Sequence, residues 1–258
     1  MAADPDAPQL YLQRDQPEGV PPLALTGERT LPDVPEENYW FQRHLVVYEW
    51  IAARVDGLHV VDVASGEGYG ADVLAGRADS VVGIEPNPEA YEHARARYPR
   101  VEFRRALADT FAEPCDAITF LQTIEHVPDP GAVLEHFKAQ LRPGGVAYVS
   151  TPNLLTIAPE GAEKPGNPWH VKEYRVEEYR ALCEAHFAHV QILGLFHARK
   201  LRLHELAIRH ARWDDVHARL GLTKRFYDRF TPAIAARDFA LRGTDLDRAL
   251  DFLAICRP

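Results

Sequence analysis

One segment constrains the fold of this chain more than any other. Residues 59–70 begin as an apolar run, pass through Asp62 and end in a turn with three closely spaced glycines. Small residues in such a turn let the backbone approach a ligand closely before a helix starts. The next apolar run, residues 80–86, reaches Glu85, whose carboxylate can accept hydrogen bonds from both hydroxyls of a ribose. This order predicts a nucleoside-binding crevice at the carboxyl ends of parallel strands.

The rest of the chain alternates short apolar runs with helical patterns. Runs that are apolar throughout are typical of parallel strands covered on both faces. The predicted strands cover residues 59–64, 80–86, 101–106, 115–122, 144–152, 189–196 and 250–256. The predicted helices cover residues 35–55, 71–78, 88–98, 131–141 and 175–187. An α/β architecture with helices on both faces of a sheet follows from this alternation.

Proline and glycine content predicts how the chain is divided. Residues 1–24 contain five prolines among polar residues and cannot hold a helix or a central strand, so we expect a flexible arm. Residues 25–258 are expected to form a single domain. Within it, the irregular stretch at about 153–172 is long enough for a lid or binding loop. A helical insertion at about 198–240 precedes the last strand.

Charge and cysteine content argue against several classes of protein. The 258 residues include 38 acidic and 29 basic ones, and the net charge of −9 repels a polyanion, so no nucleic-acid partner is expected. The three cysteines form no CxxC pair and suggest neither a disulfide framework nor a thiolate metal site, as in a reduced cytoplasm. No apolar run approaches the ~18 residues of a membrane helix, so no membrane attachment is expected.

The glycine turn reads D-x-A-x-G-x-G-x-G, and it resembles motif I of class I S-adenosylmethionine-dependent methyltransferases. Other segments share the resemblance, which covers most of the chain from about residue 26. They are the stretches at 83–86, 124–127, 141–145 and 150–153. The resemblance implies a Rossmann-like fold with a seven-stranded, mostly parallel sheet, and it implies S-adenosylmethionine as the cofactor.

The same resemblance implies which residues contact the cofactor. Glu85 would hold the ribose hydroxyls, the backbone near Ala64 and Gly66 the methionine part, and the chain around Leu107 the adenine edge. Arg43, in the leading helix, could pair with the methionine carboxylate or be structural. The expected cofactor contacts are Asp62, Ala64, Ser65, Gly66, Gly68, Glu85, Pro86, Leu107 and Arg43.

Two positions depart from the family pattern. Ala64 replaces the usual first glycine of the turn, a small change because alanine is tolerated there unless its φ is positive. Ala106 stands where an acid often meets the adenine. Adenine recognition is therefore left to backbone groups or to Asp109.

The residues expected to carry the chemistry follow the fourth strand. Gln122, Glu125 and His126 stand at positions i, i+3 and i+4, so one helical turn would bring them onto one face beside the cofactor. His170 follows the next strand and its loop, which open onto the same mouth. The pattern resembles the E-x-x-E-H…H cation site of plant small-RNA 3′-end 2′-O-methyltransferases and the E-x-x-E-H of ubiquinone-biosynthesis O-methyltransferases.

That resemblance implies a divalent cation held by Gln122, Glu125, His126 and His170. Mg²⁺ is expected, although imidazole also suits Mn²⁺, Fe²⁺ or Zn²⁺ and the sequence does not fix the ion. Gln122 replaces a glutamate of those patterns and lowers the charge of the site. Two other interpretations stay open: His126 acts as a general base without metal, or Glu125 and His126 only line the crevice. If the site holds a cation, or if His126 acts as a general base, we expect Glu125 and His126 to be the catalytic residues.

A narrower group shares further segments with this chain. Residues 27–30, 38–44, 66–72, 194–197 and 254–258 resemble mycobacterial methyltransferases associated with polymethylated polysaccharides of the methylglucose and methylmannose types. The resemblance implies a cytoplasmic O-methyltransferase acting on a sugar hydroxyl of a mannoside or glucoside. The alternatives are a quinone or catechol-like acceptor, and a module that binds S-adenosylmethionine without catalysis.

Residues 27–30 and 37–44 precede the core and could fold over the cofactor, as leading helices do in similar enzymes. The second of these segments and the helical insertion carry several aromatic residues. Tyr39 and Trp40 are predicted to pack in the core rather than to contact a ligand. The aromatics of the insertion could stack on sugar rings, but burial on a helix face accounts for them more simply. These residues are Trp213, Phe226, Tyr227 and Phe230. The insertion could instead set acceptor specificity or form the contact of a homodimer.

Overall fold

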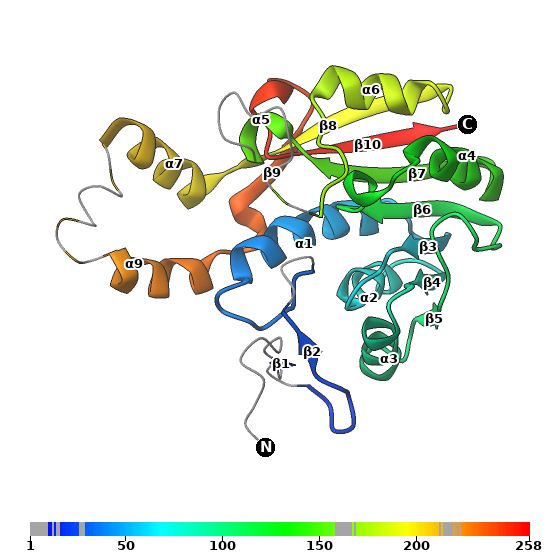
Figure 1. The fold of residues 1–258 in the computed structure, drawn as a ribbon, viewed down its shortest axis with the longest axis horizontal. Coiled ribbons are helices and arrows are strands. Elements are labelled where there is room, and N and C mark those ends of the chain that lie inside the picture. The colour runs from blue at the N-terminus through cyan, green and yellow to red at the C-terminus, as the bar shows by residue number, and fades with distance from the viewer. Residues whose placement is uncertain are drawn as a thin grey trace.

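The centre of the molecule is an eight-stranded sheet (Figure 1). The computed structural model describes residues 10–11, 13, 16–25, 29–157, 167, 169–211, 213, 219, 221 and 223–258. The strands of this sheet are β3 (His59–Val63), β4 (Ser80–Ile84), β5 (Glu102–Arg104), β6 (Cys115–Leu121), β7 (Leu141–Pro152), β8 (His189–His197), β9 (Phe239–Arg242) and β10 (Asp251–Arg257). Their order is β5-β4-β3-β6-β7-β10-β8-β9.

Most of this sheet is parallel, as the apolar runs predicted. Strands β3 to β7 pair in parallel, whereas β10 runs antiparallel to both β7 and β8. The chain moves outward from β3 to β4 on one side and to β6 on the other. In such sheets ligands bind where the strand order reverses, outside the carboxyl ends of the strands.

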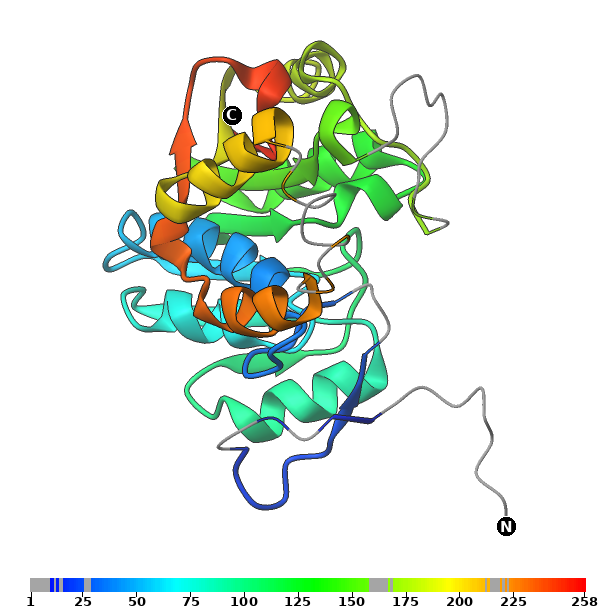
Figure 2. The same ribbon diagram turned by 90° about the vertical axis from the view of Figure 1, so that its left-hand side faces the viewer.

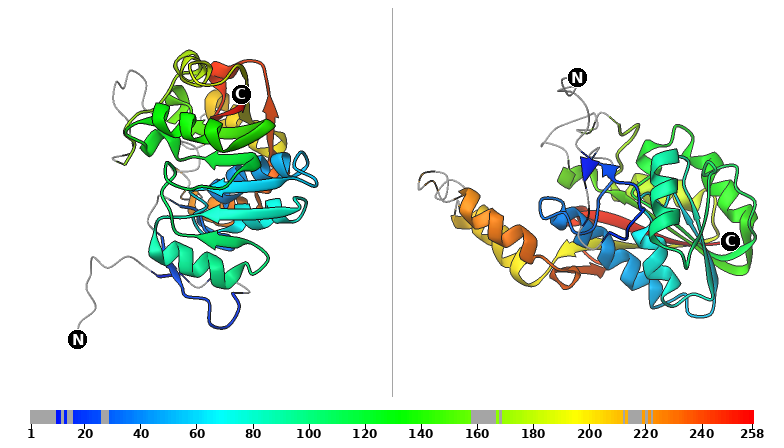
Figure 3. Two further views of the ribbon diagram at one scale, coloured as in Figure 1. Left: turned by 90° about the vertical axis from the view of Figure 1, so that its right-hand side faces the viewer. Right: turned by 90° about the horizontal axis from the view of Figure 1, so that it is seen from below.

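Helices cover both faces of the sheet (Figures 1 and 3). The helices are α1 (Asn38–Ala52), α2 (Tyr69–Ala75), α3 (Pro88–Arg97), α4 (Pro130–Gln140), α5 (Leu154–Ile157), α6 (Val176–Glu184), α7 (Arg199–Ala211) and α9 (Thr223–Phe230). On one face Ile51 of α1 and Leu74 of α2 are fully buried against the sheet, and on the other Phe137 of α4 and Tyr179 of α6 are. None of the described helices is long and apolar enough to cross a membrane.

The predicted α/β fold is confirmed, with one strand more than expected. Strand β9 begins at the end of the expected insertion and pairs antiparallel with β8 at the edge of the sheet. Its four residues show no apolar alternation, so the sequence gives little sign of a strand. The described helices of the insertion, α7 and α9, lie side by side and project from the body of the domain (Figures 2 and 3), with His204 stacked on Phe226 between them.

The N-terminal arm is packed where the structure describes its second half. Strand β1 (Leu10–Tyr11) pairs antiparallel with β2 (Leu23–Ala24). Leu23 is buried, and the carbonyl of Pro21 accepts a hydrogen bond from the buried His93 of α3, at 2.6 Å. The expectation of a flexible arm is therefore wrong for this stretch, because a few apolar side chains anchor it between the prolines. Residues 1–9 lie outside the described part.

Candidate cofactor and acceptor site

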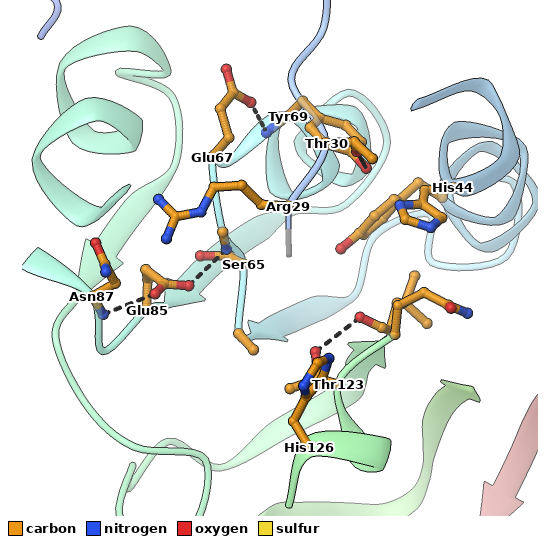
Figure 4. A pocket seen from close by; sticks show the side chains of 15 residues that line it. Arg29, Thr30, His44, Ser65, Glu67, Tyr69, Glu85, Asn87, Thr123 and His126 are labelled. Atoms are coloured by element: carbon orange, nitrogen blue, oxygen red, sulfur yellow. Dashed lines mark hydrogen bonds between the residues drawn. The ribbon is translucent and has the colours of Figure 1, made fainter. Parts of the chain in front are cut away.

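Two adjoining cavities open at the carboxyl ends of β3, β4 and β6. The first, of about 340 Å³, is shown in Figure 4. It is lined by Arg29, Thr30, His44, Tyr48, Ala64, Ser65, Gly66, Glu67, Tyr69, Glu85, Asn87, Leu121, Gln122, Thr123 and His126. The second, of about 560 Å³, shares Arg29, Thr30, His44, Gln122 and His126 with the first. The two cavities thus meet at His126 and Gln122.

Glu85 lies at the end of β4, where the sequence placed a nucleoside-binding acid. One carboxylate oxygen accepts a hydrogen bond from the backbone N–H of Gly66 at 2.8 Å, and the other from that of Asn87 at 2.9 Å. Burial raises the pKa of Glu85, and these two hydrogen bonds, together with the charge of Arg29, oppose the rise. The carboxylate is thus oriented by the glycine turn itself and lines the first cavity (Figure 4).

The glycine turn has left-handed backbone at three positions. The φ angles are +57° at Ala64, +57° at Gly66 and +100° at Gly68. The expectation that Ala64 is a harmless replacement is wrong, because its condition, a negative φ, is not met. A Cβ on Gly68 would lie 2.8 Å from the Cβ of Ala94, so glycine is needed there for space as well. The turn therefore holds one strained residue where the family pattern has glycine.

Asp62 is buried in the core and lines neither cavity. Its carboxylate is fully buried and accepts hydrogen bonds from Thr119 at 2.6 Å and from Tyr48 at 3.3 Å. Burial is the main reason that the pKa of Asp62 rises to about 7. Three other expected cofactor contacts, Gly68, Pro86 and Leu107, are not among the residues that line either cavity.

Glu67 was not singled out from the sequence, yet it is among the most heavily hydrogen-bonded side chains described. Its carboxylate is buried and accepts from Gln13 at 2.8 Å, from Tyr98 at 2.9 Å and from the backbone N–H of Tyr69 at 3.0 Å. The imidazole of His93 adds a contact at 3.1 Å. Glu67 therefore ties the N-terminal arm to the middle of the glycine turn.

Arg43 does not serve the methionine carboxylate. The guanidinium is 5% exposed, donates from Nε to the carboxylate of Asp251 at 2.7 Å and from Nη2 to the carbonyl of Leu250 at 3.0 Å. The structural alternative for Arg43 is thus the correct one, because a buried guanidinium needs a fixed counter-charge. Arg29 lines both cavities and lies toward Glu85 in Figure 4.

The second cavity gathers residues from segments far apart in the chain. It is lined by Arg29, Thr30, Glu37, Trp40, Arg43, His44, Gln122, Glu125, His126, Pro152, Ile157, Asn167 and His170. Trp40 is 41% exposed, so the prediction that it packs in the core is wrong. Tyr39 agrees with that prediction: its ring packs edge-on against Phe239, and its hydroxyl meets His197 at 2.9 Å.

The predicted helical turn with the acidic and imidazole groups is present as a single 3₁₀ turn, Ile124–His126. Gln122 precedes it in left-handed backbone, with φ +52°, and its amide N–H donates to Ser150 at 3.0 Å. Glu125 is 1% exposed and accepts from Thr151 at 3.1 Å. Burial raises the pKa of Glu125 to about 8, and the nearby carboxylates of Asp251 and Glu173 add to the rise.

His170 lies beside this turn, as predicted. The rings of His126 and His170 are 4.8 Å apart at 88°, and the ligand atoms of these two residues and Glu125 all lie within 4.8 Å of one another. Nδ1 of His126 is 3.0 Å from the carbonyl of Trp169, and Nδ1 of His170 is 2.8 Å from the carboxylate of Glu173. Both acceptors favour a proton on Nδ1. Nε2 of His170 then accepts a hydrogen bond from Nδ2 of Asn167 at 3.1 Å.

Several lining residues were not named as site residues from the sequence, although the segments 27–30 and 37–44 were expected to fold over the cofactor. They are Arg29, Thr30, His44, Tyr48, Tyr69, Asn87, Leu121 and Thr123 in the first cavity, and Glu37, Pro152, Ile157 and Asn167 in the second. Glu37, Trp40 and His44 stand at i, i+3 and i+7 of α1 and its N-cap, so they share one face of the helix. Helical spacing was therefore a usable signal for them. Burial lowers the pKa of His44 to about 4, which keeps this imidazole neutral beside the cavities.

Comparison with known proteins identifies the family. Residues 38–203 match the model of a methyltransferase domain. A Mycolicibacterium smegmatis protein, named a probable S-adenosylmethionine-dependent methyltransferase, is 43% identical over 192 residues, which are 73% of this chain and 74% of that protein. A Mycobacterium tuberculosis protein with the same description is 41% identical over 184 residues, 70% of this chain and 67% of its own. A ubiquinone biosynthesis O-methyltransferase of Pseudomonas putida is 35% identical over 128 residues, 44% of this chain and 55% of its own.

Solved structures agree on the fold. A Thermotoga maritima S-adenosylmethionine-dependent methyltransferase superposes with a TM-score of 0.58 at 18% identity, covering 86% of this chain and 95% of that one. The DhpI–SAH complex superposes with a TM-score of 0.51 at 19% identity, covering 85% and 86%. The matched domain includes the glycine turn and Glu85, which line the first cavity, Glu125, which lines the second, and His126, which lines both. This chain therefore belongs to the S-adenosylmethionine-dependent methyltransferases.

Proposed function

We propose that this methyltransferase methylates a hydroxyl group of a mannoside or glucoside with the help of a divalent cation. One observation carries the proposal. Glu125, His126 and His170 converge on the second cavity, and His126 also lines the first. The first cavity is then the cofactor site and the second the acceptor site, with the reacting atoms at the junction.

The first cavity offers suitable groups for each part of the cofactor. Glu85 would accept the ribose hydroxyls, and Ser65 and Gly66 present their backbone to the methionine part. The guanidinium of Arg29, which replaces Arg43 in this role, would pair with the methionine carboxylate. S-adenosylmethionine supplies an activated methyl group on a sulfonium. The protein then has to align the acceptor oxygen and manage its proton.

The second cavity is also suited to a cation. Glu125 and Glu173 are both buried, and Oε2 of Glu173 has no hydrogen-bond partner among the described residues. One carboxylate oxygen and one nitrogen from each imidazole form a donor set for Mg²⁺, Mn²⁺ or Zn²⁺, and the Nδ1 contacts of both histidines orient the rings for it. At His170 the cation would take the place of the Asn167 amide, which now donates to Nε2. Gln122 could add an amide oxygen. A bound divalent cation would lower the pKa of an acceptor hydroxyl.

Within this arrangement each side chain has a defined task. His126 lies where the cavities meet, so its imidazole is placed to hold the acceptor hydroxyl or to receive its proton. Glu173 fixes the ring of His170 through Nδ1, and Thr151 fixes the carboxylate of Glu125. Both are positioning residues, because they act through the groups that contact the acceptor.

The acceptor class has two kinds of support. Most residues that line the second cavity are polar and offer partners for the hydroxyls of a sugar, while apolar atoms make up the larger part of its exposed lining surface, as a sugar ring or a catechol ring would require. The resemblance to mycobacterial methyltransferases of polymethylated polysaccharides points the same way. Similarity to a ubiquinone biosynthesis O-methyltransferase favours a catechol-like acceptor as the second candidate, since adjacent hydroxyls satisfy the same cation.

The test is methyl transfer from labelled S-adenosylmethionine to mannosides, glucosides and catechols, each with Mg²⁺, with Mn²⁺ and with EDTA. Transfer to a glycoside that EDTA abolishes is the expected result. Transfer that persists in metal-free enzyme would assign His126 as a general base instead. Transfer to catechols alone would replace the acceptor class, and cofactor binding without any transfer would favour a non-catalytic module.

A further inference from the structure

Trp40 is unusual among the large aromatic residues of the described chain because it is exposed within a cavity. Trp40 is 41% exposed and lines the second cavity together with Glu37, the N-cap residue of the same helix. Burying an indole ring is favourable, so an exposed one that borders a functional cavity points to a ligand that covers it.

The Trp40 ring is held in place by two side chains, Arg43 and Tyr39. The guanidinium carbon of Arg43 lies 4.9 Å from the centre of the Trp40 ring, in a cation–π contact. Arg43 cannot move away, because it is buried and paired with Asp251. Tyr39 adds an edge contact at 5.2 Å and 87°. The indole is thus pre-organised, and a ligand that binds it loses little side-chain entropy.

We propose that Trp40 is the platform on which the pyranose ring of the acceptor stacks. This inference rests on the proposed function and deepens it. The C–H groups on one face of a pyranose carry partial positive charge and meet the negative face of an indole, while the hydroxyls project from the edge of the sugar ring. Glu37, Gln122 and Asn167 line the same cavity and can pair with those hydroxyls.

The size of the cavity defines which part of a saccharide it holds. Its volume of about 560 Å³ is within the range of roughly 300–1,000 Å³ that is typical of small-molecule sites. Such a space receives a monosaccharide or the end of an oligosaccharide. The platform therefore presents a terminal sugar residue to the junction at His126.

Substitution of Trp40 tests the platform. Trp40→Leu is expected to raise the acceptor KM about tenfold, with Trp40→Phe between it and the unchanged enzyme, because a stacking contact is worth about 1–1.5 kcal/mol. kcat and the affinity for S-adenosylhomocysteine should not change. Trp50→Leu is the matched control. Trp50 lies on the same helix and also has an arginine over its ring, with the guanidinium carbon of Arg54 3.4 Å from the ring centre. It lines neither cavity.

A binding measurement separates this inference from the proposed function. Saturation-transfer NMR with methyl mannoside, methyl glucoside and their disaccharides, in the presence of S-adenosylhomocysteine, reports contact without turnover. Sugar signals that Trp40→Leu removes and Trp50→Leu preserves would support the platform, even if no sugar is methylated and the proposed reaction is wrong. Glycoside methylation with an unchanged KM in Trp40→Leu would overturn the platform alone. No sugar contact with the unchanged protein would also overturn it.

Discussion

The cofactor half and the acceptor half of the site are built in different ways. In the half proposed for the cofactor, the groups that would hold the ribose and the methionine part come from one short stretch, in which the glycine turn and Glu85 follow each other along β3 and β4. Residues 29–30, α1 and the end of β6 complete the lining of that cavity. The acceptor half is assembled from α1, the 3₁₀ turn after β6, the segment around His170 and the start of β10. A local unit tolerates changes elsewhere, whereas an assembled one depends on contacts between distant segments.

The two halves also differ in how their charges are compensated. In the cofactor half Glu85 receives the backbone N–H groups of Gly66 and Asn87. In the acceptor half Arg43 and Asp251 compensate each other although they are 208 residues apart. Replacing one partner of the Arg43–Asp251 pair should destabilise the protein more, because it leaves the other charge buried without a counter-charge.

The largest effect is expected from breaking that distant pair. Asp251→Ala should lower the free energy of unfolding by about 3–5 kcal/mol, because Arg43 is left buried and uncompensated. Urea denaturation measures the loss. The double variant Arg43→Met/Asp251→Leu should recover most of it, since apolar replacement of both partners removes the buried charge. A loss below about 1 kcal/mol in Asp251→Ala would contradict this account.

A change in the cofactor half should weaken ligand binding without unfolding the protein. Glu85→Gln is expected to reduce the affinity for S-adenosylhomocysteine by about 10–100-fold, because hydrogen bonds to a charged group contribute about 1.5–3 kcal/mol. Calorimetry on the folded variant gives the value. Glu89→Gln, an exposed acid in the first turn of α3, is the control. Equal affinities in the two variants would remove Glu85 from the ribose site.

The buried carboxyl of Asp62 should make the free energy of unfolding depend on pH. Burial raises the pKa of Asp62 from 3.8 to about 7, so the folded protein binds more protons than the unfolded chain between these values. Asp62 should therefore make the free energy of unfolding fall as pH rises from 4 to 7, by up to about 1.4 kcal/mol per unit. Asp62→Asn should remove that slope from urea-unfolding curves at pH 5, 6 and 7. Parallel curves for both proteins would refute the shift.

The smallest effect concerns the strained residue of the turn. Ala64→Gly should stabilise the protein by about 0.5–1 kcal/mol, because relief of a left-handed alanine slightly exceeds the entropy cost of glycine. Gly66→Ala is the reverse substitution at a comparable position. Gly66 has the same φ of +57°, and nothing lies within 4 Å of an added Cβ, so only backbone strain should change. It should lose about 1 kcal/mol. If the two changes have the same sign, backbone strain is not the cause.

Sequence reasoning succeeded where contacts are local. The strands, the turn and Glu85 are identified by apolar runs and short spacing, and Glu125 and His126 lie on one turn as their spacing predicted. It failed where a partner is distant. Nothing near Arg43 in the sequence points to Asp251, and an aromatic residue in a helix gives no sign of whether it is covered.

The position of β10 has a consequence for how the protein is made. Its seven residues lie between β7 and β8 and bond to both strands, and its first residue, Asp251, is the partner of Arg43. While the ribosome is still synthesising the chain, α1 exists long before that partner does. The sheet stays split and Arg43 without its counter-ion until residues 251–257 emerge. The Arg43–Asp251 pair that supports Trp40 therefore forms late. Translation that stops before residue 251 leaves the second cavity without this support.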